Sequence, residues 1–144
     1  MKGDYRIMEV KFTIPGKPTG KARPRFSRYR SIAYTPKSTV AYESLVVLEY
    51  QAQCKMMKFS DTDMLEMVIS AYYKIPKSIS KAYRKKIENG GVFPIKKPDV
   101  DNIFKIIADS LNGIAYRDDA QIVVGVCKKY YSDTPRVDVE IRKI

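Results

Sequence analysis

Four stretches of the chain have the residue patterns of β-strands. Apolar and polar positions alternate along residues 7–14 and, most regularly, along 136–143, so one face of each strand is expected to be buried. Residues 64–75 and 121–131 are rich in β-branched and aromatic side chains. These patterns predict a sheet of about four strands.

Two further stretches are predicted to be helices. Residues 38–57 carry apolar side chains over a broad face, which indicates packing on a sheet or at a subunit interface, and Ser38 is a candidate N-cap. Residues 81–88 form a short basic helix that Ser80 can cap and that ends before the Asn-Gly-Gly run at 89–91.

A third helix is predicted near residues 99–112. Asp99, Asp101 and Asn102 are suitable N-cap types, and Gly113 follows as a stop. Apolar residues recur at helical spacing and form one face of this helix: Ile103, Ile106, Ile107 and Leu111.

The element order is therefore β-α-β-α-α-β-β. The length of 144 residues suits one domain with a real core, and no stretch has the composition of a linker. We expect a single α/β (α+β) domain over residues 1–144, with a mixed sheet and helices packed on it.

Five carboxylates lie between residues 96 and 119, in a chain whose net charge is +11. Asp101, Lys105 and Asp109 fall at positions i, i+4 and i+8 of the third helix, on the face opposite the isoleucines. This spacing predicts a charged helix face that is open to solvent or to a ligand.

A short return from this helix into the next strand can bring Asp119 back near Asp99 and Asp101. Crowded carboxylates repel one another, and Mg²⁺, which prefers carboxylate and water oxygens, relieves that repulsion. The chain has no histidine, which excludes imidazole ligands and a histidine base. Metal-assisted phosphodiester hydrolysis needs neither, and Lys105 is placed to offset the charge that develops on the phosphate.

The same residues also fit a purely structural role. Asp101 and Lys105 suit an ordinary surface pair worth a few tenths of a kcal/mol, Asp99 suits a cap, and Asp118-Asp119 suits a turn. The pattern alone leaves both readings open, because each acid has an ordinary explanation.

Residues 97–124 contain Lys-Pro-Asp-Val-Asp-Asn-Ile-Phe-Lys, then Asp-Ser-Leu-Asn-Gly, then Asp-Asp-Ala-Gln-Ile-Val. This order and spacing resemble the signature of the RusA-type Holliday junction resolvases, which are small and often prophage-borne endonucleases. The signature is fairly specific, because several positions must agree at once. Weaker similarity extends to residues 75–78 and 134–137.

The resemblance implies Mg²⁺ as the cofactor, with Mn²⁺ as a substitute. The matching metal-binding carboxylates are Asp99, Asp101 and Asp119, with the neighbouring Asp118 as an accessory. Lys105 would match the catalytic lysine, whereas Asn102 and Asp109 match positions with a structural role. The resemblance also implies a homodimer, and the approximate two-fold symmetry of a four-way junction favours one independently.

The basic balance of the chain favours polyanionic partners. Residues 16–37 hold seven lysines and arginines and no acid, and glycine and proline are expected to keep them out of regular structure. Aromatic residues are interleaved with these arginines, which suits contact with nucleic acid; the alternative is a solvated loop whose aromatic rings enter the core. The candidate DNA-binding residues are Lys21, Arg23, Arg25, Arg28, Arg30, Lys81, Arg84, Lys85, Lys96 and Lys97.

Cys54 and Cys127 are far apart and form no metal-binding or disulfide pattern, so they are interpreted as reduced, packed thiols of a cytoplasmic protein. No stretch has the length and hydropathy of a signal peptide or a membrane span, and no small-molecule cofactor is indicated.

Together these observations predict an Mg²⁺-dependent endodeoxyribonuclease that resolves four-way junctions by paired symmetric nicks, in DNA recombination and repair. Two alternatives remain at this stage. One is a non-catalytic basic protein that binds DNA or RNA, with the acids acting as caps and turns. The other is a nuclease with a different substrate, such as forks, flaps or RNA.

Overall fold

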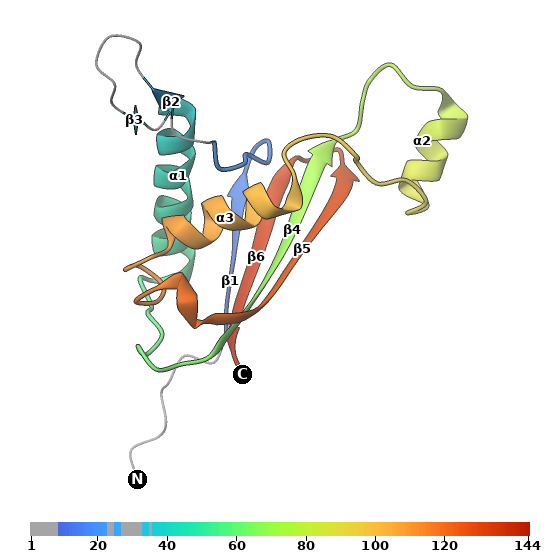
Figure 1. Cartoon of the computed structure of the whole chain (residues 1–144). Coiled ribbons are helices and arrows are strands. Elements are labelled where there is room, and N and C mark those ends of the chain that lie inside the picture. Colours follow the sequence, from blue (N-terminus) through green and yellow to red (C-terminus); the bar gives the residue numbers. More distant parts are fainter. Residues whose placement is uncertain (1–8, 23–24, 27–32, 35) are drawn as a thin grey trace.

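The computed structural model describes residues 9–22, 25–26, 33–34 and 36–144, and within these ranges four strands form one mixed sheet (Figure 1). The order across the sheet is β1 (Glu9–Pro15), β6 (Arg136–Lys143), β4 (Leu65–Lys74) and β5 (Ile122–Ser132). β6 runs antiparallel to both β1 and β4, whereas β4 and β5 are parallel. The predicted α+β domain with a mixed sheet of about four strands is confirmed.

The strand bounds follow the sequence patterns closely. β6 has the predicted bounds, and β4 and β5 differ from theirs by one residue at each end. β1 begins at Glu9, and residues 7–8 of the first predicted strand lie outside the described ranges. Alternation was a sufficient signal for β1 and β6 because each buries one face, whereas β5, which has no fully buried residue, was identified from its β-branched content.

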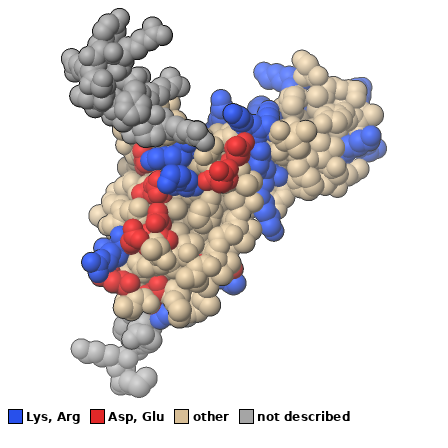
Figure 2. Space-filling view, viewed as in Figure 1, with Lys and Arg blue, Asp and Glu red and all other residues tan. Residues whose placement is uncertain are grey.

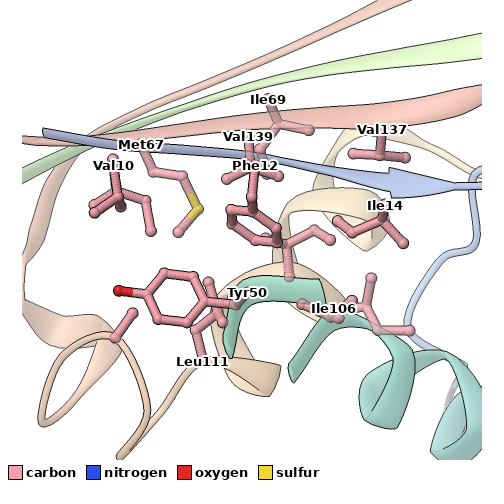
Figure 3. Close-up of a cluster of buried hydrophobic side chains, with 14 of the residues drawn as sticks. Val10, Phe12, Ile14, Tyr50, Met67, Ile69, Ile106, Leu111, Val137 and Val139 are labelled. Carbon is pink, nitrogen blue, oxygen red and sulfur yellow. The ribbon is translucent and has the colours of Figure 1, made fainter. Parts of the chain in front are cut away.

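The sheet buries one of its two faces, and two of the helices cover that face (Figures 1 and 3). Alternate residues of β1, β4 and β6 point into this core, and Figure 3 shows Val10, Phe12, Met67, Ile69 and Val139 among them. The opposite face carries exposed ion pairs such as Lys11 with Glu140. A functional site that is partly shielded from solvent is therefore expected on the face of the sheet that the helices cover.

Helix α1 (Lys37–Cys54) packs on β1 through a stripe with a spacing of four residues. Tyr42, Val46, Tyr50 and Cys54 form this buried stripe. Residues from the other side of the broad apolar face are largely exposed, including Leu48 at 62%. The face predicted from composition was thus wider than the one the sheet buries.

Both predicted ends of α1 were wrong. The helix ends at Cys54 rather than at residue 57, because Lys55 and Met56 adopt φ angles of 54° and 58°, outside the right-handed helical region. At the other end Pro36 occupies the N-cap position, and no side chain caps the helix, so Ser38 is not the cap. Pro at this point suits the extended entry to a helix.

Helix α2 (Lys81–Glu88) has the predicted bounds, and the Ser80 hydroxyl accepts a hydrogen bond from the Tyr83 N–H at 3.1 Å. α2 stands beyond the end of the sheet (Figure 1), so the expectation that the helices pack on the sheet holds for α1 and α3 but not for α2. None of the helices in the described ranges combines the length and apolar character needed to cross a membrane.

Residues 16–37 were expected to lack regular structure, and this was wrong in one respect. β2 (Arg25–Phe26) and β3 (Ala33–Tyr34) form a short antiparallel pair. Two residues a side are enough for a short antiparallel pair, so the glycines and prolines of this segment do not exclude one. Arg23, Arg28 and Arg30, three of the candidate DNA-binding residues, lie outside the described ranges.

Helix α3 (Val100–Ser110) lies beside α1 on the covered face of the sheet and packs on β5 (Figure 1). Ile103, Ile106 and Ile107 are fully buried, as the helical spacing predicts. The Phe104 ring packs over Gly125 of β5, where a Cβ atom would lie only 2.7 Å from the ring. This close approach sets the distance between α3 and the edge strand.

Candidate active site

A cavity of about 590 Å³ opens between α3 and β5. Four charged residues line it: Asp101, Lys105 and Asp109 from α3, and Asp119 from the short 3-10 helix η1 (Asp119–Gln121). The remaining lining is Val100, Phe104, Ala108, Ile122, Val123, Gly125 and Cys127. Charged groups thus share one wall of a mainly apolar cavity.

The pattern of α3 explains why this wall is charged. The isoleucine face is buried in the core, so the positions i, i+4 and i+8 of Asp101, Lys105 and Asp109 are turned the other way, as predicted. Asp101 is exposed in the first turn, where a negative charge suits the helix dipole. Asp99 is the N-cap residue by position, but its side chain makes no capping hydrogen bond.

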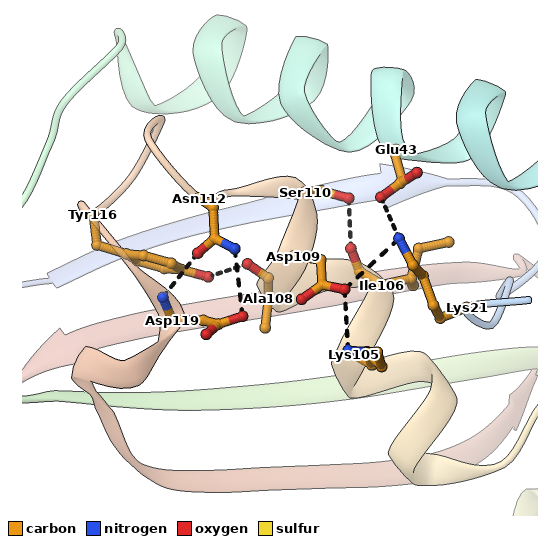
Figure 4. A network of polar contacts seen from close by, with 10 residues as sticks. All are labelled: Lys21, Glu43, Lys105, Ile106, Ala108, Asp109, Ser110, Asn112, Tyr116 and Asp119. Carbon is orange, nitrogen blue, oxygen red and sulfur yellow. Dashed lines mark hydrogen bonds and ion pairs between the residues drawn. The ribbon is translucent and has the colours of Figure 1, made fainter. Parts of the chain in front are cut away.

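Asp119 lies beside Asn112, which follows the end of α3, and beside Asp109 of the helix itself (Figure 4). The Asn112 Oδ1 accepts a hydrogen bond from the Asp119 N–H at 2.8 Å, and the Asn112 amide donates to the Asp119 carboxylate at 3.4 Å. Burial raises the pKa of Asp119 above its usual value, and the neighbouring Asp109 carboxyl raises it further, while Asn112 lowers it. Two carboxyl groups therefore share this part of the cavity wall.

A buried tyrosine stabilises the turn that connects α3 to Asp119. Tyr116 has no exposed surface, and its hydroxyl donates to the Ala108 carbonyl at 2.7 Å. Gly113 adopts a φ of 76°, which favours glycine, and its N–H donates to the Tyr116 carbonyl at 2.8 Å. These bonds fix the turn that carries the chain from α3 to Asp119.

Two lysines lie close to the Asp109 carboxylate. The Lys105 ammonium lies 3.3 Å from the Asp109 carboxylate, and that of Lys21 lies 3.7 Å from it (Figure 4). Lys21 also donates to Glu43 of α1 at 2.8 Å. Nearby cations offset the charge of the carboxylates while no other cation is present.

Asp118 has a different environment from its neighbour. Its carboxylate accepts a hydrogen bond from the Ala120 N–H at 3.0 Å and caps η1, and Gln121 completes the capping box. Gln121 also donates to the carbonyls of Ser60 and Asp63. Asp118 is not part of the cavity lining.

The topology decides where the predicted metal-binding residues lie. α3 begins beside the end of β4, where the Tyr73 hydroxyl donates to the Pro98 carbonyl at 2.7 Å, and the chain after α3 must return to the start of β5, which is parallel to β4. Asp99 is thus at one end of α3 and Asp119 at the other. At 1.5 Å per residue, Asp99 and Asp109 are about 15 Å apart along the helix axis.

The segment after α3 that carries Asp119 therefore lies against the second half of the helix. From the sequence, it was expected to lie near Asp99 and Asp101. Asp101 and Asp119 line the same cavity, but Asp99 does not. Among the residues that the structure describes, no three metal-ligating side chains are grouped closely enough to hold a metal ion.

The donor groups of the cavity nevertheless fit Mg²⁺. This ion is usually bound through one or two carboxylates, with water and substrate phosphate as its other ligands, rather than in a complete protein cage. The adjacent Asp109 and Asp119 carboxyls supply such a partial set, and Asp101 lines the same cavity. Burial raises the pKa of the Cys127 thiol to about 11, which leaves oxygen atoms as the anionic donors at neutral pH.

The candidate DNA-binding residues of the described ranges differ in exposure and in whether they form ion pairs. Lys81, Lys85, Lys96 and Lys97 are exposed, and Figure 2 shows basic side chains gathered between the α2 region and the body of the molecule. Arg84 is paired with Asp133 at 2.9 Å. Lys21 is turned toward Glu43 and Asp109, and only 22% of its side chain is exposed. β2 contains Arg25.

Sequence reasoning assigned Asp109 a structural role, although its i+8 spacing from Asp101 was the signal that placed it on the charged face. It gave no role to Asn112, which bonds to Asp119, or to Glu43, which bonds to Lys21. Asn112 lies seven residues before Asp119 in a turn, and Glu43 lies on another helix. No local pattern marks either contact.

Comparison with known proteins places these motifs in a family. A family model described as endodeoxyribonuclease RusA matches residues 15–142. An uncharacterized protein of Bacillus subtilis (strain 168), YqaN, is 34% identical over 142 residues, and the match covers 94% of this chain and 96% of YqaN.

Proposed function

Because the chain belongs to the RusA endodeoxyribonuclease family, which indicates Holliday junction resolvase nuclease activity, we propose that it cuts DNA four-way junctions with the help of a divalent metal ion. The observation that carries the proposal is the cavity between α3 and β5, where Asp101, Asp109 and Asp119 share a wall with Lys105. The product would be a pair of symmetric nicks, as recombination and repair require.

The carboxylates are proposed to hold the metal. Asp101 and Asp119 are the ligands that both the family signature and the cavity favour, and Asp99 and Asp118 are proposed from the signature alone. Asp109 adds a carboxylate that the geometry favours. When bound, Mg²⁺ or Mn²⁺ supplies Lewis-acid chemistry to the phosphate and lowers the pKa of a water molecule.

Lys105 has the properties of a residue that meets the substrate. Its side chain is 60% exposed, and its ion pair with Asp109 is an ordinary i,i+4 surface pair, so it can turn toward a phosphate at little cost. A fixed positive charge beside the scissile phosphate stabilises the negative charge of the transition state.

DNA affinity is proposed to come mainly from the basic groups around the cavity. The exposed lysines at 96 and 97 directly precede α3, those at 81 and 85 lie on α2, and Arg23, Arg25, Arg28 and Arg30 belong to the segment that precedes α1. Phosphate contacts of this kind give binding that falls steeply with salt. A C2 homodimer would present two such sites to the two strands that must be cut.

The test is a gel assay with a labelled synthetic four-way junction, with and without Mg²⁺, for the wild type and for Asp119→Asn. We expect paired nicks that require the metal and that fall by at least about 100-fold in the variant, since a carboxylate at the metal is lost. Junction binding should persist or tighten, because the change also removes a charge that repels phosphate.

Glu140→Gln is the matched control, since it also converts an acid to an amide but lies on the face of the sheet that the helices leave uncovered. It should cut as the wild type does. Binding without cutting in every divalent metal tried would overturn the proposal, and faster cutting of flaps or forks than of junctions would overturn its substrate.

A further inference from the structure

Lys21 lies between two helices, α1 and α3. Its ammonium lies 2.8 Å from Glu43 of α1 and 3.7 Å from Asp109 of α3, and the side chains of all three residues are three-quarters or more buried (Figure 4). The Asp109 carboxylate also receives Lys105 at 3.3 Å. One carboxylate of the proposed metal site is thus paired with two lysines.

The backbone around Lys21 is fixed to the start of α3. The Lys21 N–H donates to the Asn102 carbonyl at 2.9 Å. Gly20 approaches the helix so closely that a Cβ atom there would lie 2.8 Å from the Pro98 side chain and 3.0 Å from that of Asn102. The segment therefore crosses the first turn of α3 in close contact, and Lys21 reaches along the helix from there.

The two lysines differ in exposure and in what they are free to do. The Lys105 side chain is 60% exposed, whereas that of Lys21 is 22% exposed and has a second anionic partner in Glu43. A DNA phosphate can draw Lys105 away from Asp109. Lys21 would remain, because its departure would leave Glu43 and Asp109, both about three-quarters buried, as neighbouring unpaired anions.

We propose that Lys21 is a positioning residue of the site rather than a DNA contact: with Glu43, it holds the Asp109 carboxylate in place beside Asp119. This proposal rests on the proposed nuclease function. The two lysines would then have different roles. Lys105 contacts the DNA phosphate, and Lys21 keeps the Asp109 and Asp119 carboxylates side by side.

The experiment compares Lys21→Met, Lys21→Arg and Glu43→Gln with Lys11→Met. Lys11 is the matched control because it is also an ion-paired lysine, with Glu140 at 3.3 Å, but it lies on the opposite face of the sheet. Three quantities are measured: junction affinity in Ca²⁺, the single-turnover cleavage rate at saturating protein in Mg²⁺, and the amide resonances of Asp109 and Asp119 without metal or DNA.

We expect Lys21→Met to bind the junction within about threefold of the Lys11→Met protein but to cut it about 10- to 100-fold more slowly, as small displacements of catalytic groups do. The Asp109 and Asp119 resonances should move in Lys21→Met and not in Lys11→Met. Lys21→Arg should recover most of the rate, because arginine also pairs with carboxylates. Glu43→Gln should show a smaller loss in the same sense.

Two results would overturn the proposal. A loss of affinity with an unchanged rate at saturation would make Lys21 a phosphate contact, and unchanged resonances of Asp109 and Asp119 would show that it does not hold the pair. The resonances are read without DNA, so they decide the role of Lys21 even if the wild type cuts no junction. That separate outcome would instead overturn the proposed function.

Discussion

Asp118 and Asp119 are neighbours in the chain with different surroundings. The Asp118 carboxylate caps η1 through the Ala120 N–H, whereas the Asp119 carboxylate lies in the cavity wall beside Asp109. A capping group needs only a hydrogen-bond acceptor, while a metal ligand at this site needs a charge. The two roles can therefore be separated by asparagine and alanine substitutions.

At the residue scale we predict that Asp118→Asn keeps stability, because an asparagine oxygen can accept the same hydrogen bond. It should slow cleavage far less than Asp119→Asn does, because Asp118 does not line the cavity and would be an accessory ligand. Asp118→Ala should lower the free energy of unfolding by about 0.5–2 kcal/mol through loss of the cap. Urea unfolding and the junction assay measure these effects. If Asp118→Asn abolished cleavage with unchanged stability, Asp118 would be a metal ligand, as the family signature implies.

At the scale of elements, the site depends on how closely α3 approaches β5. Phe104 fills the space over Gly125, and its ring lies where any larger residue would place its Cβ atom. The cavity lies in the same crevice and includes both residues in its lining. Glycine is needed at this position for the close approach of a side chain, not for an unusual backbone angle.

We predict that Gly125→Ala destabilises the protein by about 1–3 kcal/mol, because the added methyl group overpacks the contact between helix and strand. Urea unfolding measures the change. The double variant with Phe104→Leu should lose less stability than the sum of the two single variants, since a smaller side chain makes room for the methyl group. Strict additivity would show that the Phe104 ring is not what limits residue 125.

On the scale of the whole molecule, charge is distributed unevenly. The net charge is +11, yet the open face of the sheet pairs its charges, as in Lys11 with Glu140 and Arg136 with Asp138. The exposed lysines of residues 81–97 and the arginines of residues 23–30 lie elsewhere along the chain. Phosphate binding is thus expected from part of the surface only.

Replacing Arg23, Arg25 and Arg28 together by alanine should weaken junction binding and reduce the slope of log affinity against log salt by up to about 3. Binding titrations over a range of salt concentrations measure this slope. Replacing Lys11, Lys55 and Lys58 removes the same charge and should leave the slope nearly unchanged. Equal slopes for the arginine variant and the wild type would remove this segment from the interface.

A homodimer is the other expectation at this scale. Light scattering coupled to size exclusion should give a mass of twice the 16.5 kDa chain, because two matched nicks in a two-fold junction need two sites. A mass of one chain for the free protein, together with one chain per junction in the complex, would contradict the paired-site mechanism.

Several features could be predicted from the sequence because the responsible interactions are local. α2 and β6 have their predicted bounds, since Ser80 caps its own helix and alternation marks its own strand. The charged face of α3 follows from its 3.6-residue period. The end of α1 was missed, because the left-handed conformations of Lys55 and Met56 have no signal in those residue types.

By itself, the sequence determined the three helices and the four strands of the main sheet, the charged face of α3, the family and the chemistry that carboxylates and a lysine can support. Only the tertiary structure decided which of these groups meet. A helix between two parallel strands has to run from the end of one to the start of the next, so Asp119 reaches Asp109 rather than Asp99. Contacts between distant elements, such as Lys21 with Glu43, follow from packing and leave no mark on local sequence.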